Sequence, residues 1–569
     1  MHSLLDLRVF FLQRLRPSEW QRTLLAAALI GALGALATVA FRESLFLIER
    51  LIYGRSDGLV RIAASLPWWE RLLVPAAGGV LAGLVLAWAR RTPTRGDPGD
   101  YMEAIALGSG DLGVRPSLLR ALSSAATVAS GGAIGREGPM VQLAALTGSL
   151  VGRWRHAPIP RRRLMLACGA AAGVATAYNA PIAGAMFVAE IVLQSLAIES
   201  LGPLLVASVT AHVTMTELVG AAPVYHMPVF VTPDGGTTLV FAALGIVAGL
   251  GAPLYLWVLD QGRNLFKRLT LPLPIKLGIG GLLVGALSIA RPEVWGNGYS
   301  VVDSMLQGHW AWDMLLYVML FKLLAVAAST GSGAVGGIFT PTLFMGSAAG
   351  ALFATGAQWL LPGALPAPAA TAIGMGAFLA ACTHAPLMSV LMIFEMTENY
   401  GVVVPLMLAC VLGYSISRVL RPAPIYAKAQ RNNAAHAPAL MMARDLLRLD
   451  SPTVHPGQTL RQLEEVFVKW RRPHVYVLDQ QDRFVGAVAV HDLGPLLKAG
   501  GDSNAAWPAS LLRADYPRVE DTTPLWQVLE TFAKHPGERL PVLEAGGRLL
   551  GHVTKTDLVL MLRERLSIG

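Results

Sequence analysis

The chain has 569 residues, of which 54% are hydrophobic and only 15% charged, with a formal net charge of +9. Soluble domains carry roughly 25% charged residues, so the composition excludes a wholly soluble protein and predicts that about the first 420 residues lie in a membrane. The length predicts two or three structural units, and the basic residues flank apolar segments, which favours membrane anchoring over nucleic-acid binding.

The N-terminal segment, residues 1–21, is amphipathic and basic, which predicts an interfacial helix on the membrane surface. A membrane domain is then expected over residues 22–426. Several of its apolar segments are shorter than the ~20 residues that cross a bilayer, and several are interrupted by glycine or proline. Such segments predict broken helices around a binding site near the bilayer midplane. The three cysteines, Cys168, Cys382 and Cys410, lie in apolar runs and indicate small buried residues.

The stretch GGAIGREGPMVQLAAL (131–146) places two adjacent charges inside an apolar region. An ionisable side chain at this depth costs several kcal/mol unless it has a partner or a function. Gly135 and Gly138 flank Glu137 and let the backbone turn sharply. Pro139 suits the first turn of a helix that starts near it. We therefore expect Glu137 at the amino end of a broken helix, where unpaired N–H groups and the helix dipole attract an anion. The alternative is an ordinary buried ion pair.

Two motifs recur at nearly the same offset. SGGAIGREGP at 130–139 recurs as GSGAVGGIFTP 201 residues later (333 − 132 = 201), and NAPIAGAMFVAE at 179–190 recurs as HAPLMSVLMIFE 205 residues later (384 − 179 = 205). The agreement predicts two related halves, about 22–220 and 238–419. Chance similarity of glycine-rich stretches is the alternative.

The second copy of the first motif keeps the glycine and proline chemistry without the charge. Gly336 and Gly337 free the backbone, and Pro341 is expected to begin the next helix. Ile338 and Phe339 can present backbone amides to an anion. Two helix starts aimed at one point would hold a dehydrated halide without a fixed cation, which would otherwise retain it too tightly for transport.

The C-terminal part is more polar. After a linker over 427–440, a motif around Gly486 recurs 65 residues later (551 − 486 = 65), and each copy reads helix, strand, turn, strand, helix. This predicts a tandem α/β module with units 441–503 and 504–569.

The membrane motifs, in this order, resemble the signature motifs of the CLC family of chloride channels and proton/chloride antiporters. The matching segments are Gly135-Arg-Glu-Gly-Pro139, Gly336-Gly-Ile-Phe-Thr-Pro341, AYNAPIAGAMFVAE (177–190) and Ile425-Tyr426. DYMEAI (100–105) and WGNGYS (295–300) resemble the bacterial ClcB-like branch, and the tail resembles a CBS-domain pair.

The resemblance implies an all-α polytopic membrane protein with two inverted halves and broken helices, joined to an α/β CBS-domain pair. It implies a homodimer in the cell inner membrane, with the CBS domains in the cytoplasm. Its partners would be chloride, protons and the lipid bilayer, with no nucleic acid, no required cofactor and no enzymatic activity.

By the same resemblance, Glu137 is the gating glutamate, which competes with chloride for the anion site and carries a proton when neutral. Ile338 and Phe339 give amides to the central chloride, and Tyr426 gives its hydroxyl. The chloride-binding residues implied in this way are Gly135, Arg136, Gly138, Gly337, Ile338, Phe339 and Tyr426. A structural, hydrogen-bonding role is the alternative for Arg136, and an interfacial belt position is the alternative for Tyr426.

Two positions depart from the family pattern. The region that matches the family's first motif, Arg95–Ala104, has no serine, so one hydroxyl ligand for chloride is lacking. Ile191 stands where exchanging members often have an inner, proton-carrying glutamate. The sequence therefore leaves proton-coupled antiport and a passive anion channel open. Glu190, just before it, is interpreted as structural.

Two further alternatives concern other classes of function. A membrane-embedded enzyme would need a catalytic base, for which His384 is the candidate. In the tail, Thr554-x-x-Asp557 fits a ribose-binding element, which predicts an adenine nucleotide there. The first copy lacks the hydroxyl, and a purely structural or dimer-forming module is the alternative.

Overall fold

The computed structural model describes residues 19–90, 99–106, 108–220, 223–230, 234–308, 310–360, 365–427, 442–498, 503–535 and 537–566. The chain divides into two compact units, residues 1–431 and 432–569. Most of the predicted interfacial helix and of the linker lies outside the described residues. Residues 19–21 belong to the first long helix.

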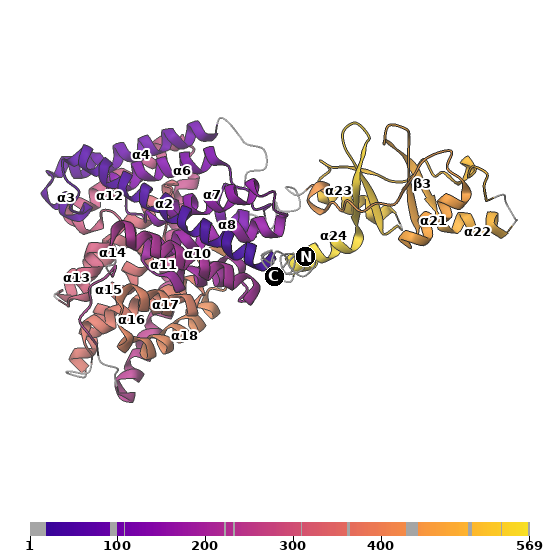
Figure 1. The fold of residues 1–569 in the computed structure, drawn as a ribbon. Helices are drawn as coiled ribbons and strands as arrows, with labels where there is room; N and C mark the ends of the chain where they lie inside the picture. The colour runs from indigo at the N-terminus through magenta and orange to yellow at the C-terminus, as the bar shows by residue number, and fades with distance from the viewer. Residues whose placement is uncertain are drawn as a thin grey trace, which may run out of the picture. The chain divides into compact units, whose positions relative to one another are not determined.

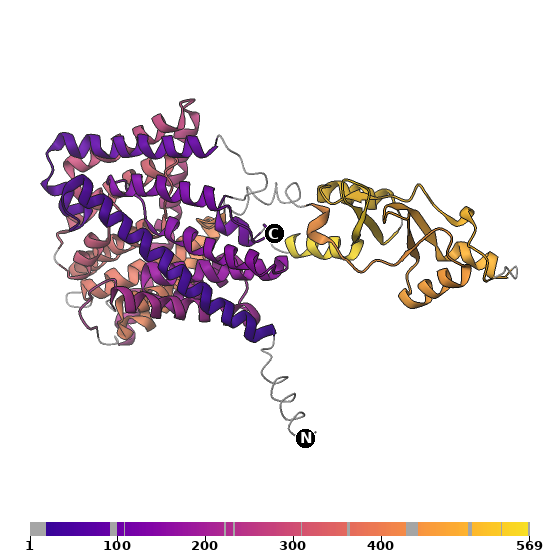
Figure 2. The same ribbon diagram turned by 45° about the horizontal axis from the view of Figure 1, so that its top comes forward.

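The first half of the membrane unit is helical throughout (Figure 1). Its elements are α2 (Glu19–Tyr53), α3 (Leu59–Ser65), α4 (Trp68–Arg90), α5 (Tyr101–Ala106), α6 (Val114–Ala129), α7 (Glu137–Trp154), α8 (Ile159–Tyr178), α9 (Pro181–Phe187), the π-helix η1 (Val188–Leu193) and α10 (Ile198–Val219). Figure 2 shows α2, in indigo, crossing the whole unit.

The second half repeats this series. Its elements are α11 (Gly235–Arg268), α12 (Leu273–Ala290), the 3₁₀ turn η2 (Pro292–Val294), α13 (Tyr299–Leu306), α14 (Trp312–Ser332), α15 (Phe339–Leu360), α16 (Ala367–Thr383), α17 (Pro386–Thr397), the 3₁₀ turn η3 (Tyr400–Val402) and α18 (Val403–Leu420).

Helix packing follows the predicted repeat. The α7–α8 contact in the first half corresponds to α15–α16 in the second, and α2–α10 corresponds to α11–α18. The equivalent helices α4 and α12 pack on each other, as do α9 and α17. Equivalent elements that pair across one axis are what two related halves produce. The predicted all-α membrane architecture joined to an α/β tail is confirmed.

The described residues contain seven helices long and apolar enough to cross a membrane. Other, more buried helices are not among these seven spans. α16 is buried at nearly every position, and α9 has only 7 residues. Long apolar helices thus enclose short, interrupted ones, which agrees with the predicted broken helices.

The described residues of the tail form two similar three-stranded sheets. In each sheet the first and second strands are parallel and the second and third antiparallel. The elements are η4 (Ala443–Leu446), β1 (Thr453–Val454), α21 (Leu460–Trp470), β2 (His474–Leu478), β3 (Phe484–Ala489), α22 (Val490–Lys498), η5 (Ala509–Leu511), β4 (Val519–Glu520), α23 (Leu525–Lys534), β5 (Arg539–Leu543), β6 (Leu549–Thr554) and α24 (Lys555–Leu566).

The segment that leads into each tail module packs on the other module. Ala443 belongs to the apolar core of the second sheet, and Trp507 and Leu511 belong to the core of the first. Ala443 N also donates to Thr523 O at 2.8 Å. Because the lead-in segments are exchanged, the two modules fold around each other.

Candidate functional site

The starts of α7 and α15 meet at a two-residue antiparallel β-bridge. Gly135 N donates to Gly337 O and Gly337 N donates to Gly135 O, both at 2.8 Å. Each helix begins two residues after its bridge glycine, at Glu137 and at Phe339. The helices therefore start two residues before the prolines from which we expected them to begin, and both prolines lie in the first turn, where no amide donor is needed.

The bridge also corrects the alignment of the two motifs by one residue. The sequence match paired Gly135 with Gly336, whereas the structure pairs Gly135 with Gly337, an offset of 202 (337 − 135). The physical reason is that two equivalent residues must exchange both backbone hydrogen bonds across the axis that relates the halves. Glu137 is thus equivalent to Phe339.

Glycine is required here because two backbones approach closely. A Cβ on Gly336 would lie 2.8 Å from Gly135 O, and one on Gly138 would lie 3.0 Å from Gly337 N. A Cβ on Gly135 would collide with Glu137 Oε2. None of these four glycines has a positive φ. Close approach, rather than the sharp turn we expected, is therefore the reason for these glycines.

Glu137 is enclosed at this junction, with only 3% of its surface exposed. Its Oε1 accepts a hydrogen bond from Asn297 Nδ2 at 3.3 Å, and its Oε2 is buried with no hydrogen-bond partner in the part of the chain that the structure describes. The carboxylate thus lies at the amino end of α7, held by one long hydrogen bond and by the helix dipole.

Tyr426 approaches the start of α15 through aromatic rings. Its ring meets the Phe187 ring edge-on at 6.0 Å between centroids, and Phe187 lies 6.1 Å from Phe339. Ile425 N donates to Cys382 O at 2.9 Å and fixes this segment after α18. Phe187 thus lies between the rings of Tyr426 and Phe339. Phe339 begins α15, Ile338 directly precedes it, and the first turn of a helix has unpaired amides.

The side chain of Arg136 points elsewhere. Its guanidinium carbon lies 5.9 Å from the centre of the Phe46 ring and 5.7 Å from that of Tyr299. No ion pair links it to Glu137 among the described residues. Only the backbone of Arg136 therefore belongs to the junction.

Two residues that were not predicted from the sequence support Glu137. Asn297 donates to its carboxylate, and Lys322 holds the loop that carries Asn297. Lys322 is fully buried, and its Nζ donates to Val294 O at 2.9 Å and to Gly296 O at 2.8 Å. Lys322 could have been found from the sequence, because it is a lone lysine in the apolar helix α14 and ionisable residues at membrane depth have a partner or a function.

Glu190 and Glu395 cap helices of the opposite half. Glu190 accepts from Leu387 N and Met388 N at 3.3 and 2.7 Å at the start of α17. Glu395 accepts from Ile182 N and Ala183 N at 2.9 and 2.7 Å at the start of α9. Each carboxylate thus stabilises a helix dipole across the axis, in agreement with the structural role expected for Glu190.

Two other predicted positions have clear surroundings. Ile191 is 5% exposed and lies in the main apolar core. His384 ends α16 in the left-handed conformation, φ 59°, as Asn179 ends α8 with φ 52°. The shared conformation indicates that His384 terminates a helix and argues against a catalytic base. Residues 95–98 of the first-motif region lie outside the described residues.

In the tail, Thr554 and Asp557 lie together at the start of α24. Thr554 Oγ1 donates to Asp557 Oδ2 at 2.8 Å, and Arg448 binds both carboxylate oxygens at 2.6 and 2.7 Å. The Arg448 guanidinium lowers the pKa of Asp557. Arg513, from the segment that leads into the second module, binds Asp492 of the first module in the same way, at 3.0 Å for both bonds. Both aspartates are therefore already paired with arginine.

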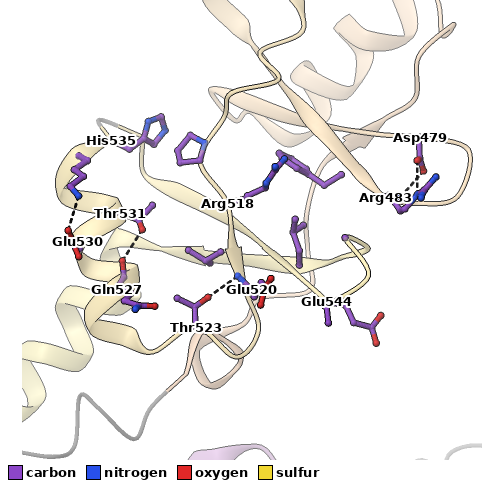
Figure 3. Close-up of a pocket in the computed structure, with 17 residues that line it drawn as sticks. Asp479, Arg483, Arg518, Glu520, Thr523, Gln527, Glu530, Thr531, His535 and Glu544 are labelled. Atoms are coloured by element: carbon purple, nitrogen blue, oxygen red, sulfur yellow. Dashed lines mark hydrogen bonds and ion pairs between the residues drawn. The ribbon is translucent and has the colours of Figure 1, made fainter.

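A pocket in the tail is a separate feature. It has a volume of about 1080 Å³ and is lined by both acidic and basic side chains, including Arg518, Glu520 and Glu544 (Figure 3). Glu530 accepts from Lys534 at 2.7 Å along its wall. Thr554 and Asp557 are not among its lining residues, so the predicted ribose element does not face this pocket.

The fold and the paired helix starts define a polytopic membrane protein of the voltage gated chloride channel family. The model of that family matches residues 78–418, more than half of the chain, and the chain belongs to the family. The CBS domain model matches residues 509–564. The family expectation from the sequence is confirmed, and a CBS domain is confirmed in the second unit of the tail.

Individual relatives agree with this assignment. The chain is 54% identical over 412 residues to a ClcB-like chloride channel protein of Ralstonia nicotianae, covering 72% of this chain and 96% of the relative. It is 44% identical over 410 residues to the voltage-gated ClC-type chloride channel ClcB of Salmonella typhimurium, covering 71% and 98%. The crystal structure of a slow cyanobacterial Cl⁻/H⁺ antiporter is similar with a TM-score of 0.64 and 26% identity, covering 73% and 98%.

Proposed function

We propose that this protein transports chloride across a membrane and that Glu137 is the removable plug of its anion site. The observation that carries the proposal is the glycine bridge, which brings two helix starts together around a buried carboxylate with one unbonded oxygen. An anion site built from helix ends accepts a carboxylate or a halide equally well. The names of the relatives, which are chloride channels and a Cl⁻/H⁺ antiporter, support chloride as the substrate.

In this mechanism the negative Glu137 occupies the site from which chloride is excluded. Protonation neutralises the carboxylate and removes its attraction to the helix ends, so the side chain leaves and chloride enters. The amides at Ile338 and Phe339 and the Tyr426 hydroxyl then bind the ion as neutral donors, which release it readily.

Proton coupling divides the proposal into two cases. An antiporter would move protons to Glu137 through water or another group, because Ile191 cannot carry them. A channel would pass chloride without stoichiometric exchange. The resemblance to a Cl⁻/H⁺ antiporter favours the first case, and the apolar surroundings of Ile191 favour the second.

A liposome assay tests both the transport and the plug. Vesicles with the purified protein receive a chloride gradient, and chloride efflux and internal pH are recorded together. We expect chloride efflux, with uphill proton movement in the antiporter case only. Glu137→Gln should abolish proton movement and leave chloride efflux intact. A Glu137→Gln variant that coupled protons as the parent does would contradict the role of Glu137.

We further propose a homodimer in a bacterial inner membrane with the tail in the cytoplasm. The proposal rests on the resemblance to bacterial ClcB proteins and on the apolar helices. Protease accessibility of the tail in oriented vesicles and the mass of the solubilised protein test the two parts.

For the tail, the arginine–aspartate pairs favour a structural module over a nucleotide sensor. A ribose at Asp557 would have to displace Arg448, which makes two hydrogen bonds of 2.6 and 2.7 Å. Calorimetric titration with AMP and ATP decides between the two. We expect no binding to the parent, and submillimolar binding would restore the nucleotide prediction.

A further inference from the structure

Two arginine side chains line a cavity that the transport site does not use. The cavity has a volume of about 310 Å³ and lies beside the start of α7, between α2, α8 and α10. Arg42 of α2 and Arg136 line it, together with the apolar side chains of Val39, Met140 and Met215. It therefore combines two cations with an apolar wall.

Neither guanidinium is fully paired within the described residues. Arg136 contacts two aromatic rings but makes no hydrogen bond or ion pair to a carboxylate there. Arg42 pairs with Glu43 at 3.3 Å, while its Nε is buried without a hydrogen-bond partner. Several guanidinium donors thus remain available at the cavity.

The nearby carboxylates do not line this cavity. Glu43 follows Arg42 on α2, and 59% of its side chain is exposed. Glu49 is buried on α2, and its charge interacts with that of Arg136. Glu43 and Glu49 thus supply counter-charges within the chain, but the lining residues of the cavity include no carboxylate. The guanidinium donors at the cavity are therefore open to an anion that carries several oxygen acceptors.

The size and the donors select the kind of anion. A single halide would leave most of a 310 Å³ cavity empty. Guanidinium groups match phosphate oxygens through paired N–H donors, and the apolar wall suits the glycerol and acyl carbons next to a lipid phosphate. We propose that the cavity bounded by Arg42 and Arg136 binds a phosphate group, either of an anionic phospholipid or of free inorganic phosphate.

Ligand-induced thermal stabilisation of the full-length, delipidated protein in detergent tests the proposal without any transport. The probes are dioctanoyl phosphatidylglycerol, dioctanoylglycerol, which lacks the phosphate, and inorganic phosphate. The variant is Arg42→Gln, and the matched control is Arg50→Gln, which removes an exposed arginine of the same helix outside the cavity. Arg42→Lys, which keeps the charge without the paired donors, replaces Arg42→Gln if that variant does not fold.

We expect phosphatidylglycerol to raise the melting temperature of the parent and of Arg50→Gln, and dioctanoylglycerol to leave it unchanged. Arg42→Gln should require about tenfold more phosphatidylglycerol, the loss expected for hydrogen bonds to a charged group. Stabilisation by inorganic phosphate alone would support the site with free phosphate as its source. The proposal is overturned if neither phosphate probe stabilises the parent, or if the position 42 variant responds at the parent's concentrations.

Discussion

Replacing Asn297 with alanine removes the one hydrogen bond that the described residues make to the Glu137 carboxylate. The Nδ2–Oε1 distance of 3.3 Å is slightly longer than the 2.7–3.2 Å of ordinary N–H···O bonds. A hydrogen bond to a charged group contributes about 1.5–3 kcal/mol, and we take ~1 kcal/mol for this long one. That energy corresponds to about a fivefold change in the equilibrium between the plugged and open positions of Glu137.

In the proposed mechanism, chloride efflux from vesicles reports this equilibrium while the Glu137 carboxylate is charged. We expect Asn297→Ala to raise the efflux rate about fivefold, because the carboxylate leaves the site more easily. Proton movement should persist if the parent shows it, since Glu137 is still present.

A double-mutant cycle isolates the interaction from general effects of the substitution. In a Glu137→Ala background there is no carboxylate to release, so Asn297→Ala should leave efflux unchanged. Unaltered or slower efflux in a well-folded Asn297→Ala protein would refute the reasoning. Equal acceleration in both backgrounds would refute it as well.

Three other predictions follow from buried or capped groups. Lys322→Met leaves the carbonyls of Val294 and Gly296 without a donor and should lower the free energy of unfolding by about 3 kcal/mol, which a thermal melt in detergent detects. Glu190→Gln and Glu395→Gln each remove charge from a helix start and should each lower stability by ~1 kcal/mol, with closely similar melting shifts because their settings are equivalent. In the tail, burial, and to a lesser extent the charge of Arg539, lower the pKa of His552 from 6.5 to about 4. As the pH falls, the unfolded state therefore binds a proton at a higher pH than the folded state does. The stability that neutral His552 provides should therefore be complete above pH 6.5 and be lost as the pH falls toward about 4, and His552→Gln should remove that part of the pH dependence of tail unfolding.

The sequence was sufficient for features that depend on local chemistry. Glycine and proline at the two motifs predicted helix starts with free amides, and both helices begin within two residues of the expected prolines. The repeated motif ends in a glutamate in each copy, Glu190 and Glu395, and both residues cap helices in the same way. The period of the apolar residues and the composition also distinguished the membrane helices from the α/β tail.

Features that depend on contact between distant segments were beyond the sequence. Nothing local pairs Asn297 with Glu137, which lies 160 residues earlier, or places Lys322 under the loop of Asn297. The exchange of lead-in segments in the tail is similar, since Ala443 packs into the core of the second module, which lies far along the chain from it. The direction of the Arg136 side chain was also not predictable, because it is determined by Phe46 and Tyr299 on other helices.

The equivalence of Glu137 with Phe339 explains how a nearly symmetric frame produces an asymmetric transporter. Both residues start a helix two positions after a bridge glycine, so both occupy the same place relative to converging amides. One place holds a carboxylate that a proton can neutralise. The other holds an aromatic ring that packs 4.8 Å from Tyr178 and cannot change charge. Inverted halves alone would respond identically from both sides of the membrane. In the proposed mechanism, the response to pH enters through the side chain at position 137.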